Sequence, residues 1–324
     1  MRAAWYETQG PAQQVLQVGT MPDPIPGPGE VRIRMAASGI NPGDIKKRQN
    51  AFGYGMAFPR VIPHSDGAGT IDLVGEGVSA ARIGERVWCY GAQSYRPFGT
   101  AAEYTSVPTA QAVPLPENVS FEQGACLGIP TITAHRCVHV AGPVEGRPVL
   151  IQGGAGAVGI CAVQFARRAG ATVIAAVRTG ADDATAQDAG AHHVVHIGLD
   201  LVQQVHALAP QGVSHIVDVA FGANIAADVD MLDVRGSIAT YATNVDAPAI
   251  PFWLLLFKNI RIDFLGSDDF APADKEEAAR ATNEALLSGW RGMPIVEQFP
   301  LNEIASAHEV VESSRLRGRV VVML

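Results

Sequence analysis

The feature that most constrains the fold of this chain is a glycine-rich segment, Gly154-Ala155-Gly156-Ala157-Val158-Gly159, which matches the pattern GxGxxG. It directly follows an apolar run over residues 148–152, typical of a buried strand, and it precedes a helix-like stretch over 158–169. In that context the first glycine makes a tight turn, the second lets the backbone approach a pyrophosphate, and the third permits close helix packing. The segment therefore predicts a dinucleotide-binding turn, with a glycine-rich turn that binds no ligand as the alternative.

Further apolar runs continue the strand pattern beyond this turn. Residues 172–177 and 215–219 are typical of buried strands, and helical segments lie between them, as parallel βαβ units require. We therefore expect an α/β domain, built as a doubly wound parallel sheet, over residues 121–261.

The N-terminal part of the chain has a different pattern. Short apolar or alternating runs at residues 31–35, 70–74, 86–89 and 101–105, separated by Gly and Pro, predict a mainly β domain over residues 1–120. The tail, residues 262–324, contains a helix-like run near 275–287 and a final strand over 319–323. We expect this tail to return to the first domain and complete it.

Composition and charge exclude several classes of function. With 324 residues, 48% of them hydrophobic and 17% charged, the chain can bury a core large enough for two domains. The net charge of -8 and the lack of any block of consecutive Lys or Arg argue against nucleic-acid binding. The most apolar run, residues 251–257, is far shorter than the roughly 20 residues that a membrane-spanning helix needs, and it predicts a core or interface element.

Cysteine usage and the first residues bear on the compartment. The sequence starts without the apolar run of a secretory signal, so we expect a cytoplasmic protein. The four cysteines, Cys89, Cys126, Cys137 and Cys161, are irregularly spaced and form no CxxC, which argues against a disulfide framework and against a thiolate zinc site. We expect them to be buried small apolar residues.

The residues after the second strand of the α/β domain bear on the choice of cofactor. An NAD-specific site has Asp or Glu there, about 20 residues after the glycine pattern. This chain has Arg178-Thr179, and the planar, multi-donor guanidinium group suits a 2′-phosphate. We therefore expect NADPH and not NADH; the alternative is a solvated Arg178 that pairs with Asp182 or Asp183.

Together these motifs resemble the zeta-crystallin-like quinone oxidoreductases of the medium-chain dehydrogenase/reductase superfamily. The resemblance spans nearly the whole chain. Besides the glycine pattern it includes residues 38–44 (SGINPGD), 62–69 (IPHSDGAG), 84–87 (GERV), 98–104 (FGTAAEY), 128–134 (GIPTITA), 307–309 (AHE) and 318–319 (GR). It implies a GroES-like catalytic domain, a Rossmann cofactor domain, a cleft between them and often a homodimer.

The resemblance also implies that zinc is absent. Zinc-dependent relatives have an early Cys ligand and a Gly-His-Glu motif, whereas this chain has Asn41-Pro42-Gly43-Asp44 and His64-Ser65-Asp66. Because no soft ligand stands near His64, we expect a structural or substrate-lining histidine and not a metal ligand.

The family's cofactor contacts can be carried over residue by residue. Relatives often have Tyr where this chain has Lys46, and Tyr or His where it has Ile197, so the 2′-phosphate is assigned to Arg178, with His196 and Arg315 as further candidates. The full set of contacts implied by the resemblance is Asn41, Thr131, Gly154, Ala155, Gly156, Ala157, Val158, Gly159, Arg178, Thr179, Tyr241, Ala242, Phe264, Leu265, Gly266 and Arg315.

We therefore expect a zinc-free NADPH-dependent oxidoreductase that passes reducing equivalents to a quinone. Such a reduction builds negative charge on an oxygen of the acceptor, which hydrogen-bond donors stabilise. The candidate catalytic residues are Asn41, Lys46, Tyr54 and His64, although Tyr54 and Tyr95 lie in Gly-rich aromatic loops that suit packing as well as a planar substrate. Two alternatives remain: an enone or 2-alkenal double-bond reductase, and a crystallin-like protein that binds NADPH without turnover.

Overall fold

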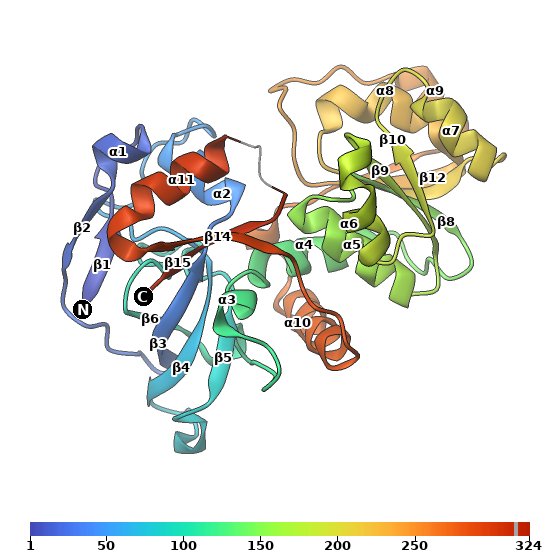
Figure 1. Cartoon of the computed structure of the whole chain (residues 1–324). Coiled ribbons are helices and arrows are strands. Elements are labelled where there is room, and N and C mark those ends of the chain that lie inside the picture. The colour runs from blue at the N-terminus through green and yellow to red at the C-terminus, as the bar shows by residue number, and fades with distance from the viewer. Residues whose placement is uncertain (314–316) are drawn as a thin grey trace. The chain divides into compact units, whose positions relative to one another are not determined.

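A computed structural model describes residues 1–313 and 317–324 and divides the chain into two compact units (Figure 1). Unit 1 comprises Met1–Ile129 and Lys275–Leu324, and unit 2 comprises Pro130–Asp274. The predicted boundary between residues 261 and 262 falls inside strand β13 (Arg261–Phe264), which is paired within the sheet of unit 2.

Unit 2 is built on a six-stranded parallel sheet in the order β10-β9-β8-β11-β12-β13. This confirms the predicted doubly wound α/β fold. Its strands are β8 (Pro148–Gln152), β9 (Thr172–Val177), β10 (His193–His196), β11 (Val213–Asp218), β12 (Leu232–Thr240) and β13. Its helices are α4 (Gly128–His139), which begins in unit 1, α5 (Ala157–Arg168), α6 (Asp183–Asp188), α7 (Leu201–Leu208), α8 (Phe221–Met231) and α9 (Phe252–Lys258).

The strand order fixes where a ligand can bind to this sheet. From β8 the chain proceeds to β9 and β10 in one direction, and from β11 it proceeds to β12 and β13 in the other. Right-handed crossovers therefore put α5 and α6 on one face of the sheet and α7, α8 and α9 on the other. The neighbours β8 and β11 form the topological switch point, and ligands of open α/β sheets bind at the carboxyl ends of such strands.

Unit 1 contains, within its described residues, a seven-stranded sheet that follows the order β14-β15-β3-β4-β5-β7, with β6 paired to β3. These strands are β3 (Glu30–Gly39), β4 (Asp66–Val74), β5 (Arg86–Cys89), β6 (Tyr104–Pro108), β7 (Ala112–Pro114), β14 (Ile295–Pro300) and β15 (Arg319–Met323). A small sheet pairs β1 (Arg2–Trp5) with β2 (Gln17–Thr20). The helices are α1 (Ala12–Val15), α2 (Pro42–Arg48), α3 (Phe121–Gly124), α10 (Pro272–Leu287), which begins in unit 2, and α11 (Ile304–Glu312).

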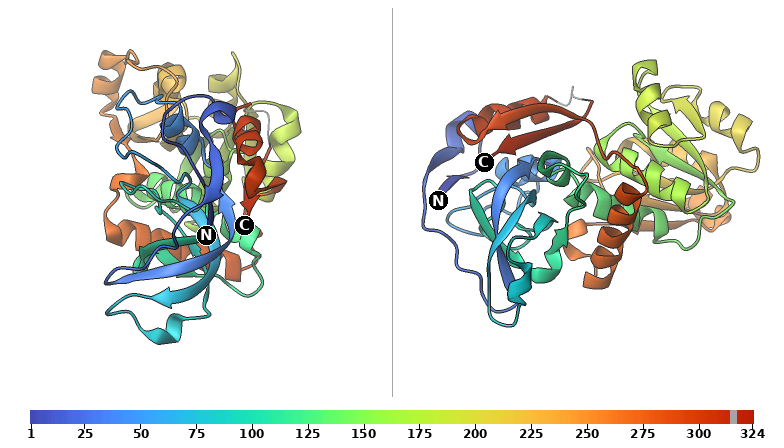
Figure 2. Two further views of the ribbon diagram at one scale, coloured as in Figure 1. Left: turned by 90° about the vertical axis from the view of Figure 1, so that its left-hand side faces the viewer. Right: turned by 60° about the horizontal axis from the view of Figure 1, so that its bottom comes forward.

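The C-terminal tail contributes strand β15 to the sheet of unit 1. Strand β15, red in Figures 1 and 2, runs antiparallel beside the blue strand β3. The predicted strand over 101–105 is displaced, since β6 begins only at Tyr104. The amides of Thr100 and Ala101 instead donate to the carbonyls of His64 and Pro63, so this segment bends around the 63–64 loop.

Each unit has its own hydrophobic core. All four cysteines are buried, which confirms the prediction that they pack as small apolar residues. The apolar run at 251–257 forms α9, whose side chains Phe252, Trp253 and Phe257 are 55%, 65% and 72% exposed. The sequence predicted that this run is either a core element or an interface element. The exposure of these side chains excludes a wholly buried core helix.

In the described part of the chain, no helix combines the length and the apolar character needed to cross a bilayer.

Candidate cofactor and active site

The glycine turn joins β8 to α5 and owes its shape to the missing side chains. A Cβ on Gly159 would lie 2.0 Å from the carbonyl oxygen of Gly153, and one on Gly154 would lie 2.7 Å from the Cβ of Ala175. Gly153 itself has φ +70°, a left-handed conformation that favours glycine. By contrast, a Cβ on Gly156 would meet only the Gly153 oxygen, at 3.3 Å.

Helix α5 presents its positive end at this turn. The helix has 12 residues, begins at Ala157 after the N-cap Gly156, and has no acidic side chain in its first turn. Its first amides, those of Ala157, Val158 and Gly159, have no carbonyl partner one turn earlier within the helix. Free amides and an uncompensated helix dipole together suit a pyrophosphate.

The other cofactor residues predicted for unit 2 gather at the same edge of the sheet, with Thr131 as the exception. Because the strands are parallel, all their carboxyl ends meet at one edge, and Thr131 instead lies buried in α4. The residues at the edge are Arg178 and Thr179 after β9, Tyr241 and Ala242 after β12, and Phe264, Leu265 and Gly266 at and after the end of β13.

Arg178 is exposed and forms no ion pair with another residue of unit 2. The two acidic partners that the sequence suggested are engaged elsewhere. Asp182 accepts hydrogen bonds from the backbone N and the Oγ1 of Thr179 at 3.2 and 3.0 Å, and Asp183 pairs with His196 at 2.9 Å. His196 lies opposite Val177 in the β9–β10 register, beside Arg178, whereas Arg315 lies outside the described residues.

In unit 1, Asn41 is held between two charged side chains. It is the N-cap residue of α2, and its Nδ2 donates to Asp66 Oδ2 at 2.6 Å while its Oδ1 accepts from Arg319 Nη2 at 2.8 Å. The two contacts fix the orientation of the amide, because a flipped amide would turn its oxygen toward the carboxylate. These contacts leave the second Nδ2 hydrogen unused, on a residue that is 3% exposed.

Asp66 is the second member of this cluster and is fully buried. Burial raises the pKa of its carboxyl to about 7, while the hydrogen bond from Asn41 and the charge of Arg319 oppose that rise. Both carboxylate oxygens also accept from the Ile129 amide at 2.9 Å. Our sequence reasoning did not select Asp66 or Arg319 as site residues; the available signal was a charged residue at the first position of a strand.

His64 is buried with both ring nitrogens bonded within unit 1. Its Nδ1 lies 2.7 Å from Ser38 Oγ, and its Nε2 lies 2.9 Å from His308 Nε2. Its φ is +74°, and burial, together with the charge of Arg319, lowers its pKa to about 3. The ring is therefore neutral at physiological pH.

The hydrogen-bond chain through His64 assigns both tautomers. Thr100 Oγ1 donates to the Asp66 carbonyl at 2.6 Å, so it accepts from Ser38, and Ser38 in turn accepts from His64 Nδ1. His64 Nε2 is then an acceptor, which makes His308 the donor between the two rings. Because both nitrogens of His64 are used, the geometry favours a structural role over direct catalysis.

The two remaining catalytic candidates lie on or after α2. Lys46 is partly exposed on that helix. Tyr54 is 63% exposed and stacks on Phe52, with ring centroids 5.7 Å apart and planes inclined by 9°. Tyr95, in the second aromatic loop, is 70% exposed. An exposed stacked pair such as Phe52 and Tyr54 offers a flat apolar surface.

Among the residues that the structure describes, no three or more His, Cys, Asp or Glu side chains come together in a way that would suit a metal ion.

Comparison with known proteins places both units in known families. The model described as "Alcohol dehydrogenase GroES-like domain" matches residues 27–117, and the model described as "Zinc-binding dehydrogenase" matches residues 157–283. The first match lies within unit 1, and most of the second lies within unit 2.

Individual relatives align over almost the full length. The quinone oxidoreductase of Rattus norvegicus is 30% identical over 327 residues, with 98% of this chain and 96% of the relative covered. A mycobacterial protein solved in complex with NADPH has a TM-score of 0.87 at 26% identity, with both chains fully covered. A 2-haloacrylate reductase has a TM-score of 0.84 at 26% identity, covering 100% of this chain and 99% of its own. The chain therefore belongs to the quinone oxidoreductase family within the medium-chain dehydrogenase/reductase superfamily.

Proposed function

We propose that this chain is an NADPH-dependent oxidoreductase that passes reducing equivalents to a quinone. The observation that carries the proposal is the glycine turn after β8, with Arg178 following the neighbouring strand β9. Relatives named quinone oxidoreductase and a similar structure in complex with NADPH support it.

The preference for NADPH rests on the charge at the end of β9. The exposed guanidinium of Arg178 is free of the two nearby aspartates, and Arg178-Thr179 stand where an NAD-specific site has an acidic residue. A 2′-phosphate would form charge-assisted hydrogen bonds there, to which the neighbouring His196 can add.

When bound, NADPH would supply the hydride, and hydrogen-bond donors of the protein would stabilise the charge on the acceptor oxygen. Asn41 offers one amide hydrogen in a fixed orientation, since Asp66 and Arg319 hold the rest of its amide. Asn41 is buried, whereas Lys46 is partly exposed and Tyr54 is exposed, so these two are the more accessible donors among the four candidates. His64 has no ring nitrogen left and supports its neighbours instead.

A double-bond reductase is the second candidate function, favoured by the similarity to a 2-haloacrylate reductase. An activated alkene develops the same oxygen-centred charge when a hydride is added, so the same donors would serve both reactions. The third reading is a protein that binds NADPH without turnover.

One experiment separates these three functions. The purified protein is mixed with NADPH and either phenanthrenequinone, a 2-alkenal or no acceptor, and the loss of nicotinamide absorbance is followed. Faster loss with the quinone is the expected result, and faster loss with the alkenal assigns the second function. Tight NADPH binding without oxidation by either acceptor would assign the third, and a protein that binds no NADPH would contradict all three.

We also propose that the reaction proceeds without zinc. The donor set supports this, because both nitrogens of His64 are engaged by Ser38 and His308, and the nearest residues in the chain supply no thiolate. Dialysis against a chelator is expected to leave the turnover rate unchanged, and a rate restored only by added Zn²⁺ would refute the proposal.

A cytoplasmic location belongs to the same proposal. It is supported by four buried thiols without a disulfide, which is typical of proteins from reducing compartments.

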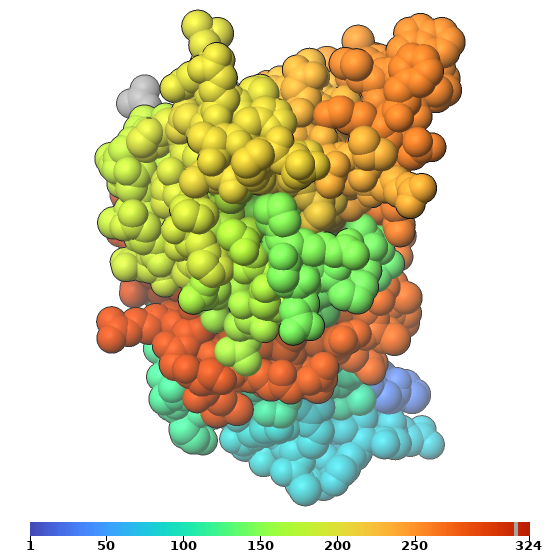
Figure 3. Space-filling view, turned by 90° about the vertical axis from the view of Figure 1, so that its right-hand side faces the viewer, coloured from blue at the N-terminus to red at the C-terminus, as the bar shows by residue number. Residues whose placement is uncertain are grey.

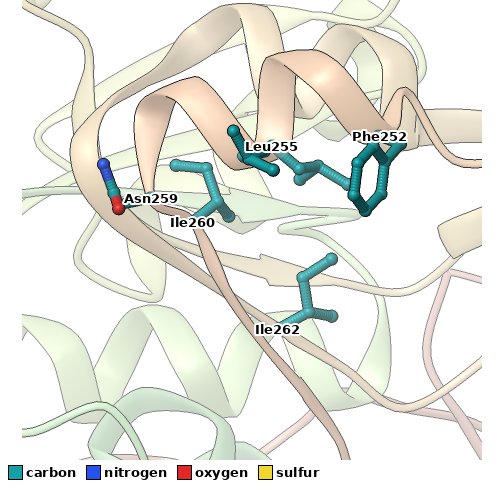
Figure 4. Close-up of a pocket in the computed structure, with 6 residues that line it drawn as sticks. Phe252, Leu255, Asn259, Ile260 and Ile262 are labelled. Atoms are coloured by element: carbon teal, nitrogen blue, oxygen red, sulfur yellow. The ribbon is translucent and has the colours of Figure 1, made fainter.

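We further propose that the chain forms a homodimer through β13. This strand is at one edge of the unit 2 sheet, and a pocket of about 420 Å³ is lined by residues of α9 and by Ile262 of β13 (Figure 4). Phe252 of α9 lines this pocket, and the exposed Trp253 and Phe257 lie on the same helix. The orange part of the chain that contains α9 projects at the upper right of Figure 3. An unpaired edge beside exposed apolar side chains favours pairing with another strand.

A second copy of the chain fits this edge by charge. If two β13 strands pair antiparallel about Ile262, Arg261 of each strand lies opposite Asp263 of the other. Opposite charges at directly opposed positions stabilise a strand pair. Within the chain Asp263 already accepts from Arg261 through Oδ1, at 2.7 Å, while its Oδ2 has no partner.

A further inference from the structure

Two buried polar side chains beneath the glycine turn share one hydrogen bond and leave one oxygen each without a partner. Gln152 is the last residue of β8, and its Nε2 donates to Asp228 Oδ1 of α8 at 2.8 Å. Both residues are almost completely buried, at 1% and 0% exposed. Gln152 Oε1 and Asp228 Oδ2 have no hydrogen-bond partner in the described structure.

The two unpartnered oxygens belong to side chains that already share one hydrogen bond. A proton on the carboxyl group of Asp228 explains this arrangement best. If Asp228 is ionised, Gln152 Oε1 and Asp228 Oδ2 both stay unsatisfied, and a negative charge is buried with a single donor. If Asp228 is protonated, its Oδ2 hydroxyl can donate to Gln152 Oε1. The acid and the amide then form a closed ring of two hydrogen bonds, with neither oxygen left over.

A neighbouring aspartate shows where the negative charge of this region resides. Asp218, at the end of β11, accepts from the Ala220 amide at 3.0 Å, from Asn224 Nδ2 at 2.7 Å and from Thr240 Oγ1 at 3.1 Å. Three donors stabilise an ionised carboxylate, whereas Asp228 has only one. When two buried carboxyl groups interact, the proton resides on the less solvated one.

The remaining charged groups around α8 do not offer Asp228 a cation. Burial raises its pKa well above the ordinary value, the charge of Asp218 raises it further, and the bond from Gln152 opposes the rise. His215 on β11 is buried, and its ring bonds Ser237 and the Cys137 carbonyl. Lys258 on α9 reaches α8, but its Nζ donates to the backbone carbonyls of Val229, Asp230 and Leu232. The other titratable residues on α8, and on α7 and β12 packed against it, are His206, Asp230, Asp233 and Arg235.

We propose that Asp228 is a neutral carboxylic acid paired with Gln152 in two hydrogen bonds, and that this pair positions the glycine turn, which begins at the next residue, Gly153. Asp228 is thus a positioning residue that acts through the backbone of β8. The proposal reaches beyond the cofactor assignment, because the protonation of Asp228 is testable in the protein without NADPH.

The first test uses Asp228→Asn, whose side-chain amide can donate to Gln152 Oε1 and accept from Nε2 as the acid does. At neutral pH, the infrared difference spectrum between the parent protein and this variant is expected to contain the carbonyl stretch of a protonated carboxylic acid. A difference spectrum with carboxylate bands alone would overturn the assignment. Asp66 does not interfere, since it is present in both proteins.

The second test follows stability against pH. The unfolded chain releases the Asp228 proton above about pH 4, while the native chain keeps it, so rising pH destabilises the parent relative to Asp228→Asn until the native pKa is passed. Chemical unfolding of both proteins at a series of pH values is expected to reveal this loss. If the free energy of unfolding changed with pH in the same way in both proteins, the proposal would be overturned.

The third test addresses the positioning role. Asp228→Leu removes both hydrogen bonds and is expected to weaken NADPH binding severalfold in a fluorescence titration, while Asp228→Asn retains the parent affinity. If Asp228→Leu does not fold, Gln152→Met removes the same two hydrogen bonds by changing the other partner, and it is likewise expected to weaken NADPH binding. Unchanged affinity in folded Asp228→Leu or Gln152→Met would refute the positioning role. A parent protein that binds no NADPH would instead refute the proposed function and leave the first two tests standing.

Discussion

At the residue scale, the proposed preference for NADPH over NADH depends on Arg178. Its guanidinium has no ion pair with Asp182 or Asp183, so replacing it removes no recorded ion pair of the fold. Arg178→Ala is expected to raise the dissociation constant for NADPH by about 10- to 100-fold, the loss of one charge-assisted hydrogen-bonded pair, and to leave that for NADH unchanged. Fluorescence titration with both nucleotides measures this.

Arg168→Ala is the matched control, because Arg168 lies at the opposite end of α5 from the glycine turn. Equal preference for NADPH in the parent and in Arg178→Ala would contradict the assignment.

The buried pair His64 and His308 predicts sensitivity to acid. Burial, followed by the charges of His64 and Arg48, lowers the pKa of His308 well below its ordinary value. The unfolded chain therefore binds more protons than the native one as the pH falls through about 6.5, and stability decreases there. For each such histidine the loss between about pH 7.5 and about pH 5.5 amounts to about 1.4 kcal/mol.

His308→Gln keeps a donor for His64 and an acceptor for Arg48 but removes this titration. Urea unfolding at both pH values is expected to show a smaller acid-induced loss in the variant, by about 1.4 kcal/mol. The control is His193→Gln, which changes an exposed histidine on β10. If His308→Gln lost as much stability on acidification as the parent does, His308 would not be neutral in the native protein.

At the residue scale, the sequence predicted the residues that stand in motifs and missed those that act through burial. The family resemblance pointed to Asn41, and local patterns pointed to Arg178 and the glycines; these assignments stay predictions. Neither pointed to Asp66 and Arg319, because their importance arises only when β4 and β15 bring them to either side of Asn41. Asp228 was missed for the same reason, since the partner that explains it, Gln152, is 76 positions away.

At the scale of elements, the glycines of the turn have two different roles: one is needed for packing of the fold and the other for binding of the cofactor. Gly159→Ala would push a Cβ to 2.0 Å from the Gly153 oxygen and is expected to cost about 1–3 kcal/mol of folding stability. Gly156 has φ -81°, which alanine adopts freely, and its nearest atom would be 3.3 Å away. Gly156→Ala is therefore expected to fold with nearly parental stability but to bind NADPH weakly, because its methyl group would meet the pyrophosphate.

Thermal unfolding and NADPH titration of both variants check this difference. If Gly156→Ala bound NADPH as tightly as the parent, the pyrophosphate would not lie on this turn.

The aromatic loop after α2 makes a second prediction about elements. The stacked pair Phe52 and Tyr54 would bind a fused-ring quinone through its face, and an aromatic stack contributes about 0.5–1.5 kcal/mol. Tyr54→Ala is therefore expected to raise KM for phenanthrenequinone by about threefold to tenfold and to change KM for a benzoquinone less.

Tyr54→Phe separates stacking from hydrogen bonding at the same position. Parental kcat and KM in this variant assign Tyr54 to stacking, whereas a lower kcat assigns its hydroxyl to charge stabilisation. If Tyr54→Ala had parental kinetics with both quinones, the loop would have no part in substrate binding.

Element prediction succeeded where apolar runs are long and failed where tertiary contacts decide. Strands β8 and β9 coincide with the predicted runs, since a buried parallel strand is apolar throughout. The strand predicted at 101–105 begins late because the amides of Thr100 and Ala101 bond the 63–64 loop and not a ladder. The pattern of apolar residues within 101–105 gives no indication of these hydrogen bonds to residues 63 and 64.

At the scale of the whole molecule, the proposed dimer depends on charge order along one edge strand. Two β13 strands paired antiparallel about Ile262 place two Arg261–Asp263 contacts across the interface, related by the two-fold axis. Asp263→Arg would replace both contacts with pairs of arginines, and directly opposed like charges destabilise a strand pair. This variant is expected to dissociate at concentrations where the parent sediments as a dimer.

The swapped variant, Arg261→Asp with Asp263→Arg, restores opposite charges at every opposed position and is expected to recover the dimer. Glu277→Arg, a charge reversal on α10, is the control for a general effect of charge. Sedimentation equilibrium gives the dissociation constant of each protein, and thermal unfolding distinguishes loss of the dimer from loss of the fold. The swap also restores the pair that Arg261 and Asp263 form within one strand, so thermal unfolding is needed to separate that effect from pairing between copies. A swapped variant that folds stably but stays as monomeric as Asp263→Arg would place the interface elsewhere or at another register.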